Sequence, residues 1–598
     1  MIYLNPELIL QKTLLGREFI MNMLFLTAFT AFVTILSLAS DCFSAQHFVS
    51  QQNPEAADEN PGTLTKPYKT IGKAISVAEA GDSIIVYEGV YRERIKIPEG
   101  KPDSPVSIRA AARENGGHEE VVISGADIID SWESYEGGDA PQNASIWVHR
   151  SWDHVWVGWN ENMSHGAPPP IGRCEQVIVD GALLKPVLSI KDMEPGTFLA
   201  DPKETKALYV RLSNDDPPDK HLIEASVRET LISAPDHTIV QGLTFRYASN
   251  RAQHGAIDIS GKRVLVEDCV VEWTNGSGIR IRGENFILRR VVSRNNGQLG
   301  MGGSGRNFLI EECVFQNNNV KGFSSGWEAG GYKIVRSWGA KIERCEAVGN
   351  HGPGMWFDID NYAGEVRQCY CADNDNSGIF IEISGDFLIT DNLCVNNGGM
   401  GKGDWAGAGI SLGESRDCYV AFNTCVDNQY GISIRGQIPR EVGDIIYMNR
   451  GITIRNNILA YNSKAQFGLM WDQVFMGRHP GQRDLSEEEW QKQLQNAIDP
   501  NNVGLILDYN LYASAEDAEL VRWGVSWRPK WKPYADLSAL ADKQGLERHG
   551  EVTGPRFVSR EERDFRLMPD TPAITTDGYI RFGMRHPAFN MKQVVASD

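Results

Sequence analysis

The sequence lacks a basic surface charge and, after its first 45 residues, any apolar run long enough to cross a bilayer. Its 59 Lys and Arg residues are outnumbered by 78 Asp and Glu residues, and the net charge is −19. Nucleic-acid partners require a basic face for their phosphates, and a membrane-spanning helix requires about 20 apolar residues. We therefore expect neither nucleic acid nor membrane as a partner of the mature chain.

Cysteine pairs with metal-binding spacing and calcium-binding loops are also absent. None of the 10 cysteines stands in a C-x-x-C pair, which zinc sites commonly use. No acidic run has the ligand spacing of a calcium loop, so we predict no required cofactor and no metal ligand, while calcium at Asp360 or Asp373 is left open. Several cysteines recur instead at corresponding positions of a repeat, where we expect apolar packing rather than disulfides: Cys269, Cys313, Cys345, Cys369 and, nearby, Cys371, Cys394 and Cys425.

The N-terminus has the organisation of a secretory signal peptide. Arg17 precedes an apolar run from Met23 to Leu38, and small residues follow from Ser40 to Ala45. A basic start, a short apolar stretch and small residues near a cleavage site are typical of exported chains. We predict a signal peptide over 1–45, cleavage near residue 45, and a secreted mature protein, periplasmic or extracellular.

Glycine is abundant, at 59 residues, and much of it belongs to a repeat. From about residue 240, short β-branched segments each end in an Asn-rich turn and, in most cases, a Gly-apolar pair, as in V-L-V-E-D-C-V-V-E-W-T-N-G-S-G-I. The period is about 22 to 25 residues, the length of one rung of a parallel β-helix. The predicted fold class is all-β, a right-handed parallel β-helix of about ten rungs. Like residues should stack in ladders, here the turn residues Asn296, Asn318, Asn350, Asn374, Asn428 and Asn462.

The other segments are assigned around this repeat. Residues 46–126 contain an amphipathic helix that is expected to cap the open end of the β-helix, followed by its first rungs. Residues 127–225 lose the period and show alternating strands with Asp-Gly turns, which predicts an inserted antiparallel, β-sandwich-like module. We expect the main β-helix with its active face over 226–515, and a C-terminal tail that packs back along it over 516–598.

Two acidic residues end apolar strands of neighbouring rungs. When the rungs are aligned on the Gly after each Asn turn, Asp358 and Glu382 share one column. Adjacent rungs are about 4.8 Å apart, close to the roughly 5 to 5.5 Å between the carboxyl groups of retaining glycosidases. One of two acids so close should stay protonated. Asp360 is the rival candidate for either catalytic role, and the same column is predicted to hold Arg282, Lys333, Arg435 and Asp472.

Other residues near the same turns suit the binding of a sugar. Glu328 begins the segment E-A-G-G-Y-K, whose glycines would let a loop bulge outward. Insertions before Lys333 and after Asn397 would wall a pocket, which favours an exo-acting enzyme. Flat aromatic rings stack on the apolar faces of sugars, and four tryptophans lie near these turns: Trp327, Trp356, Trp405 and Trp471. We predict that these residues, with Lys333 and the other basic and acidic members of the column, bind substrate.

The segments G-M-W-F-D-I-D-N and F-I-E-I-S-G, one rung apart, resemble the W-L-D and F-V-E-V-S motifs of glycoside hydrolase family 120, the β-helix β-xylosidases. This resemblance implies Asp358 as the nucleophile and Glu382 as the acid/base. The E-A-G-G-Y-K segment and the inserted module are similar to the group around family 141, which includes fucosidases and xylanases. The resemblance covers most of the chain in layout and two rungs in specific motifs. It implies a retaining exo-acting glycosidase, xylosidase-like or fucosidase-like, on plant or algal polysaccharide fragments.

Two other functions fit the same fold. A polysaccharide lyase or uronate epimerase would need a base, for which Lys333 is the candidate, and Arg282, Arg435 or calcium to neutralise the uronate. The acidic chain and the paired central acids favour the hydrolase. A non-catalytic carbohydrate-binding surface protein is the third possibility, because a fold does not determine function. In each case the expected partner is an oligosaccharide or polysaccharide.

Overall fold

The structure is a computed structural model of the 598-residue chain. It describes residues 44–154, 169–201, 204–399, 407–436, 440–471, 484, 486–489, 504–514, 517–526, 532–575, 581, 583 and 584. The predicted signal peptide lies outside these residues except for its last two. Within the described part of the chain, no helix is both long and apolar enough to cross a membrane.

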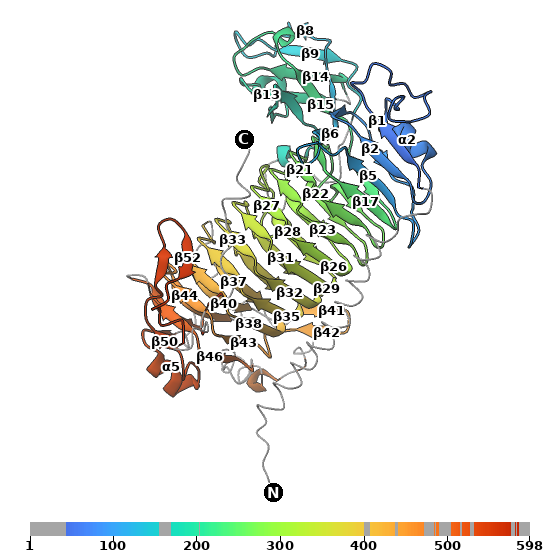
Figure 1. The fold of residues 1–598 in the computed structure, drawn as a ribbon. Helices are drawn as coiled ribbons and strands as arrows, with labels where there is room; N and C mark the ends of the chain where they lie inside the picture. The colour runs from blue at the N-terminus through green and yellow to red at the C-terminus, as the bar shows by residue number, and fades with distance from the viewer. Residues whose placement is uncertain are drawn as a thin grey trace.

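Each turn of the chain adds one strand to each of three sheets, which together form an elongated stack (Figure 1). The first sheet runs from β1 (Gln46–Val49) to β46 (Ile506–Asp508) and the second from β3 (Gly89–Tyr91) to β50 (Glu551–Val552). The third runs from β4 (Ile95–Lys96) to β49 (Lys532–Tyr534). Apart from the terminal pair β48–β49, neighbouring strands are parallel, which confirms the predicted parallel β-helix. Each sheet has 13 strands rather than about ten, because the first and last rungs lack the Asn-turn signature.

The third sheet positions the candidate site. Alternate residues of each strand point into the core, so the residues between them form an outward face. Ile281, Ile334 and Phe357 are inward residues of this sheet. Between β4 and β49 its strands are β16 (Ile232–Ala234), β19 (Gly255–Ile259), β22 (Ser277–Ile281), β25 (Leu299–Gly303), β28 (Gly330–Val335), β31 (Met355–Asp358), β34 (Ile379–Glu382), β37 (Ala408–Gly413), β40 (Tyr430–Gly436), β45 (Ala465–Trp471) and β48 (Glu519–Trp523).

One continuous apolar core runs along the inside of the three sheets. Like side chains of successive rungs stack in it, as Phe286 and Phe308 do with ring centroids 4.7 Å apart. The described cysteines are buried free thiols, and all except Cys174 belong to this core, as the repeat predicted. Burial raises the pKa of Cys269 and Cys418 to about 12, so both remain uncharged thiols at neutral pH.

Two ladders of buried asparagines connect the rungs at their turns. In the predicted ladder, Asn350 Nδ2 donates to Asn374 Oδ1 at 2.9 Å and Asn374 Nδ2 donates to Asn397 Oδ1 at 2.8 Å. The predicted turn residues all belong to this ladder, which Asn397 completes. A second ladder was not predicted. It continues the cysteine column, since the Cys369 N–H donates to Asn392 Oδ1 at 2.9 Å, and it consists of Asn392, Asn423, Asn457 and Asn510.

The second ladder ends on a buried acid. Glu547 Oε1 accepts a hydrogen bond from Asn510 Nδ2 at 2.6 Å and from the Tyr512 hydroxyl at 2.7 Å. The residue is only 2% exposed. Burial raises the pKa of Glu547 to about 7, so the folded state favours the protonated form of this carboxyl group.

We expect the Glu547→Gln variant to lose a pH-dependent part of the free energy of unfolding. The contribution of a raised pKa is complete below the ordinary value of 4.5 and is lost as pH rises through about 7. A neutral amide of the same shape avoids this loss, so the variant should be more stable than the parent by on the order of 2 kcal/mol at pH 9 and nearly equal at pH 5. Urea unfolding at both pH values measures the difference. The same pH dependence in both proteins would contradict the assignment.

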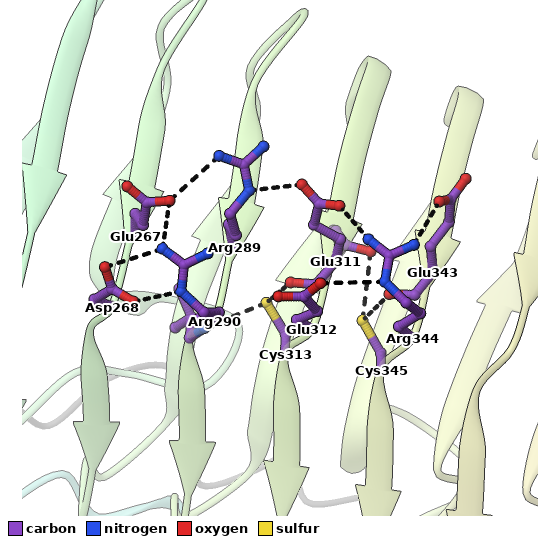
Figure 2. A network of polar contacts seen from close by, with 12 residues as sticks. Glu267, Asp268, Arg289, Arg290, Glu311, Glu312, Cys313, Glu343, Arg344 and Cys345 are labelled. Carbon is purple, nitrogen blue, oxygen red and sulfur yellow. Dashed lines mark hydrogen bonds and ion pairs between the residues drawn. The ribbon is translucent and has the colours of Figure 1, made fainter. Parts of the chain in front are cut away.

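An ion-pair network lies at the turn between the first and second sheets (Figure 2). Arg289 bridges two rungs, with Nε 2.6 Å from Glu311 and Nη1 3.2 Å from Glu267. Arg344 likewise reaches Glu311 at 2.6 Å. Every acid in the network has an arginine partner, so the network is a structural feature of the stack rather than a candidate site. Its members are Glu267, Asp268, Arg289, Arg290, Glu311, Glu312, Glu343 and Arg344.

Helices cover both ends of the core. The predicted helix is α2 (Ile71–Val77), which packs against β1, β2 (Ser83–Val86) and β4 and buries Ile71 and Ala74. It begins after Thr70, whose side chain accepts a hydrogen bond from a backbone N–H of the first turn. A second helix, α5 (Leu537–Gln544), was not predicted, and it packs Leu537 and Leu540 onto the last rungs of the core.

The inserted segment and the C-terminal tail both pack on the β-helix. Two mainly antiparallel sheets lie at its N-terminal end (Figure 1), and Lys321 Nζ joins them to the rungs by bonding Asn275 Oδ1 at 2.6 Å and the Arg173 carbonyl. The hairpin of β51 (Phe557–Ser559) and β52 (Asp564–Leu567) lies against the second sheet, where Arg563 pairs with Asp373 at 2.6 Å. The inserted strands are β7 (Ala126–Ile128), β8 (Glu133–Ser134), β9 (Trp147–Arg150), β10 (Val177–Val179), β11 (Ala182–Leu183), β12 (Lys185–Pro186), β13 (Thr197–Asp201), β14 (Ala207–Arg211) and β15 (Ile223–Ser226).

Candidate active site

Asp358 and Glu382 end neighbouring strands on the outward face of the third sheet. Asp358 is the last residue of β31, Glu382 is the last residue of β34, and the two are Cα partners in the parallel register. Their backbones are therefore about 4.8 Å apart, and their side chains share one face. The predicted one-rung spacing of the two acids is confirmed.

Lys333 does not share the column of the acids, so this part of the glycine alignment was wrong. Its Cα partner is Trp356, and the partner of Asp358 is Val335. Several glycines precede β28, and aligning on one of them shifted the register by two residues. Residues two apart share a face, so Lys333 still points outward. Its Nζ lies 2.8 Å from Asp358 Oδ2, with both side chains 8% exposed, and 2.7 Å from the Trp327 carbonyl oxygen.

Aromatic and cationic side chains alternate beside the acids. Lys333 Nζ lies 3.8 Å from the centroid of the Trp356 ring. That ring stacks on Phe380 with centroids 5.6 Å apart, and Arg435 Cζ lies 4.3 Å from the Phe380 centroid. Trp356 Nε1 also donates to Glu382 Oε2 at 3.2 Å. Phe380 was not predicted, although its position two residues before Glu382 in the same strand places it on the same face.

The surroundings of the two acids favour different protonation states. Burial raises the pKa of Glu382 to about 7, and the negative charge of Asp358 acts in the same direction, while Arg435 opposes it. The ion pair with Lys333 favours the carboxylate form of Asp358. Asp358 Oδ1 is buried and accepts no hydrogen bond from any residue that the structure describes. A carboxylate with an unbonded oxygen therefore lies one rung from a carboxyl group that keeps its proton near neutral pH.

Asp360 does not lie on the face of Asp358, contrary to the two-residue spacing. The strand ends at Asp358, and Ile359 and Asp360 have φ values of 57° and 65°. These left-handed conformations end the alternation of the strand and begin the turn to the first sheet. Asp360 Oδ1 instead accepts a hydrogen bond at 2.6 Å from the hydroxyl of Tyr447, which ends β42 (Ile445–Tyr447) of a hairpin with β41 (Arg440–Val442).

The loop before β28 brings Glu328 to the site. A Cβ on Gly302, one rung before Lys333, would lie 3.7 Å from Glu328 Oε1, so Glu328 covers this glycine. Burial raises the pKa of Glu328, and the charge of Lys333 opposes that shift. Trp327 contributes its carbonyl oxygen to Lys333, while its ring packs against a small apolar cluster formed by Ala252 and neighbouring residues.

The remaining predicted residues are placed differently. Arg282 lies three rungs, or about 14 Å, before Asp358 and pairs with Asp258 at 2.6 Å, so it is not brought to the acids. Arg435 lies two rungs after Glu382, as predicted. Its Cα partner is Met470 and not Asp472, which corrects the column. Trp405, Asp472 and the side chain of Trp471 lie outside the described residues.

The two acids considered for calcium have protein partners. Asp373 binds Arg563, with contacts of 2.6 and 2.8 Å, and Asp360 binds Tyr447. Within the described residues, no three or more His, Cys, Asp and Glu side chains form a group that could hold a metal ion.

Comparisons with known proteins bear on the fold. Residues 255–424 match the family model "Right handed beta helix region", and residues 55–102 match "Protein of unknown function (DUF1565)". The fold is a right-handed parallel β-helix. The structure "The complex structure of XylC with xylose" superposes with a TM-score of 0.58 at 19% identity, over 81% of this chain and 87% of that one.

Two further matches are more distant or shorter. The A-module of the Azotobacter vinelandii mannuronan C-5 epimerase AlgE6 gives a TM-score of 0.40 at 11% identity, over 81% of this chain and 93% of that one. The "Uncharacterized protein YwoF" of Bacillus subtilis (strain 168) is 32% identical over 80 residues, which is 13% of this chain. That match spans 16% of the relative's own length.

Proposed function

We propose that this chain is a retaining glycoside hydrolase in which Asp358 is the nucleophile and Glu382 the acid/base. The observation that carries the proposal is the pair of carboxyl groups on neighbouring rungs. One is ion-paired with Lys333 at 2.8 Å, and the other has a pKa raised to about 7. Environments that separate the protonation states of two acids are how such enzymes assign a nucleophile and an acid. The spacing of adjacent rungs suits the retaining rather than the inverting geometry.

The reaction proceeds in two displacements. Asp358 Oδ1 attacks the anomeric carbon, and the glycosidic C–O bond breaks as Glu382 gives its proton to the leaving oxygen. Water then attacks the anomeric carbon of the Asp358 ester while the Glu382 carboxylate accepts the water proton. The Asp358–sugar bond breaks, and both carboxyl groups return to their starting forms. Lys333 stabilises the Asp358 carboxylate at the start and the end of this cycle.

The proposed substrate is an oligosaccharide fragment of a plant or algal polysaccharide, cleaved from its end by an exported enzyme. Xylose or fucose is the proposed terminal sugar. The support is the resemblance of the two acid-bearing segments to the family 120 β-xylosidases, together with the shared fold of XylC, whose structure contains xylose. A solvent-poor site also suits the enclosure of one terminal sugar, since the side chains of Lys333 and Asp358 are each only 8% exposed.

A lyase or epimerase that uses Lys333 as its base is less well supported. A base must offer a free lone pair. The Lys333 ammonium instead directs its protons at Asp358 Oδ2 and the Trp327 carbonyl oxygen. Loss of a proton from Lys333 would break these contacts and leave the buried Asp358 carboxylate uncompensated.

The test is an assay of wild type and Glu382→Gln on a panel of aryl glycosides and uronate polysaccharides, recording both phenol release and the absorbance of unsaturated products. We expect phenol release by the wild type on a xyloside or fucoside, and a loss of about 10²- to 10⁴-fold in the variant on substrates that need acid assistance. Glu365→Gln is the matched control, because Glu365 forms an ordinary ion pair with Lys341 at 3.2 Å on the first sheet. Unsaturated product that survives Glu382→Gln would rule the mechanism out in favour of a lyase.

The pH profile provides a second test through Trp356. Activity of the wild type should fall as pH rises through about 7, because Glu382 must carry a proton to act as the acid. Trp356→Phe removes the N–H that stabilises the Glu382 carboxylate but keeps an aromatic ring between Lys333 and Phe380. The pKa of Glu382 should then rise, and the alkaline limb of kcat/KM should move to higher pH. An alkaline limb that stays in place would show that Glu382 is not the group that limits activity there.

A further inference from the structure

An exposed tryptophan lies at the edge of the proposed active site. Trp338 is 59% exposed and is the first residue of β29 (Trp338–Glu343) in the first sheet. It follows Val335, the Cα partner of Asp358, by three residues. Its own Cα partner, Tyr362, follows Asp358 by four residues and begins β32 (Tyr362–Arg367). Four residues span at most about 14 Å, so both rings lie within reach of a short oligosaccharide held at Asp358.

Trp338 is the outer member of a series of rings that starts at the turn after Asp358. The Trp338 and Tyr362 ring centroids are 5.8 Å apart. Those of Tyr362 and Tyr447 are 5.9 Å apart. The Tyr447 hydroxyl donates to Asp360 Oδ1 at 2.6 Å. A scattered exposed ring is ordinary on a protein surface, but this one continues a connected aromatic series that leads away from the proposed nucleophile.

Arg416 holds the series in place. Its Nη2 donates to the Tyr362 hydroxyl at 2.6 Å, and its Cζ lies 5.4 Å from the Tyr362 centroid and 5.7 Å from the Tyr447 centroid. Gly385 lies between Tyr362 and Arg416 in the register. A Cβ on Gly385 would lie 2.9 Å from Arg416 Cγ and 3.3 Å from Tyr362 Cε1, so the absence of a side chain there lets Arg416 reach across one rung.

We propose that Trp338 and Tyr362 form a stacking platform for a pyranose unit of the substrate, one that lies beyond the sugar bound between Asp358 and Glu382. This inference rests on the proposed function. A pyranose presents an apolar face of C–H groups that covers a flat ring, and a rim of hydroxyls that accept hydrogen bonds from the exposed guanidinium of Arg306, the other Cα partner of Trp338. One exposed indole is too small for a stable protein interface, which buries about 1,200 Å² or more, but it matches one sugar ring.

Calorimetric titration of catalytically blocked protein tests the platform. Asp358→Asn and the double variant Asp358→Asn/Trp338→Ala are titrated with xylo- and fuco-oligosaccharides of two to four units. We expect the loss of the indole to raise Kd about fivefold to tenfold for the longer ligands, and Trp338→Phe to restore most of the affinity. Tyr419→Ala, which removes another exposed ring of the first sheet, is the matched control and should leave Kd unchanged.

The outcomes separate this inference from the proposed function, which is tested on aryl glycosides. Equal Kd values with and without the Trp338 indole, or no binding by either protein, would overturn the platform even if the wild type hydrolyses glycosides. Weaker binding on loss of the indole, in a protein whose wild type releases no phenol, would uphold the platform and overturn the hydrolase. As a kinetic counterpart, Trp338→Ala should hydrolyse a glycosyl fluoride at the wild-type rate, because fluoride reaches no further subsite, but lose the preference for longer oligosaccharides.

Discussion

Asp358→Asn is expected to lower kcat/KM by on the order of 10⁴-fold, a loss typical of removing one member of a catalytic set. The amide cannot form the glycosyl ester, and it also leaves the Lys333 ammonium without the carboxylate that lies 2.8 Å away. The measurement is phenol release from the best aryl glycoside of the panel. Mass spectrometry after treatment of the wild type with the matching 2-fluoro glycoside should locate the trapped sugar on Asp358.

Asp360→Asn is the matched control for this experiment. It changes the neighbouring acid in the same way, but Asp360 points to Tyr447 rather than to the face of the third sheet. We expect its kcat/KM to stay within a few-fold of the wild type, with a loss of stability of about 1 kcal/mol from the weakened hydrogen bond. If Asp360→Asn were the inactive variant, or if the trapped sugar were on Asp360, the assignment of the nucleophile would be wrong.

Asn374→Ala is expected to lower the free energy of unfolding by about 2 to 4 kcal/mol, because it leaves several buried groups without partners. Asn374 is 1% exposed. Its Nδ2 donates to Asn397 Oδ1 and to the Ala347 carbonyl, and its Oδ1 accepts from the Asn350 side chain, all at 2.8 to 2.9 Å. Thermal or urea unfolding with a spectroscopic readout measures the loss.

The control for the ladder is Asn396→Gly in the same turn. Asn396 is exposed, bonds only Asp373 among the described residues, at 2.6 Å, and has a φ of 54°, which glycine adopts without strain. This variant should be within about 1 kcal/mol of the parent, since exposed polar contacts contribute little. Equal stability of Asn374→Ala and the parent would mean that the ladder does not hold the rungs together.

The repeat made the fold and the central pair of acids predictable. Stacked rungs place residues one period apart in contact, so a regular spacing in the sequence becomes a column in space. Asp358 and Glu382 could be paired for this reason, and so could the buried cysteines and the first asparagine ladder. Phe380 could have been found by the same logic, because it is two residues before Glu382. These inferences need only the period of the repeat and the two-residue alternation of strands.

Predictions failed where the period is interrupted. The loop before β28 contains extra glycines, so the register of Lys333 was misjudged by two residues. The left-handed residues Ile359 and Asp360 end a strand, and a pattern of alternation cannot show where alternation stops. The hairpin that brings Tyr447 to Asp360 is an insertion with no counterpart in other rungs, so no column predicts its contacts.

The sequence by itself therefore determined the β-helix, its core and the one-rung separation of the two acids, because these depend on contacts between equivalent positions of a repeat. Only the tertiary structure decided what surrounds the acids. The ion pair of Lys333 with Asp358, the bond from Trp356 to Glu382 and the series of rings ending at Trp338 join residues that no period relates. Protonation states depend on the burial and charge that such side chains provide, and these arise only when insertions and turns are folded against the regular rungs.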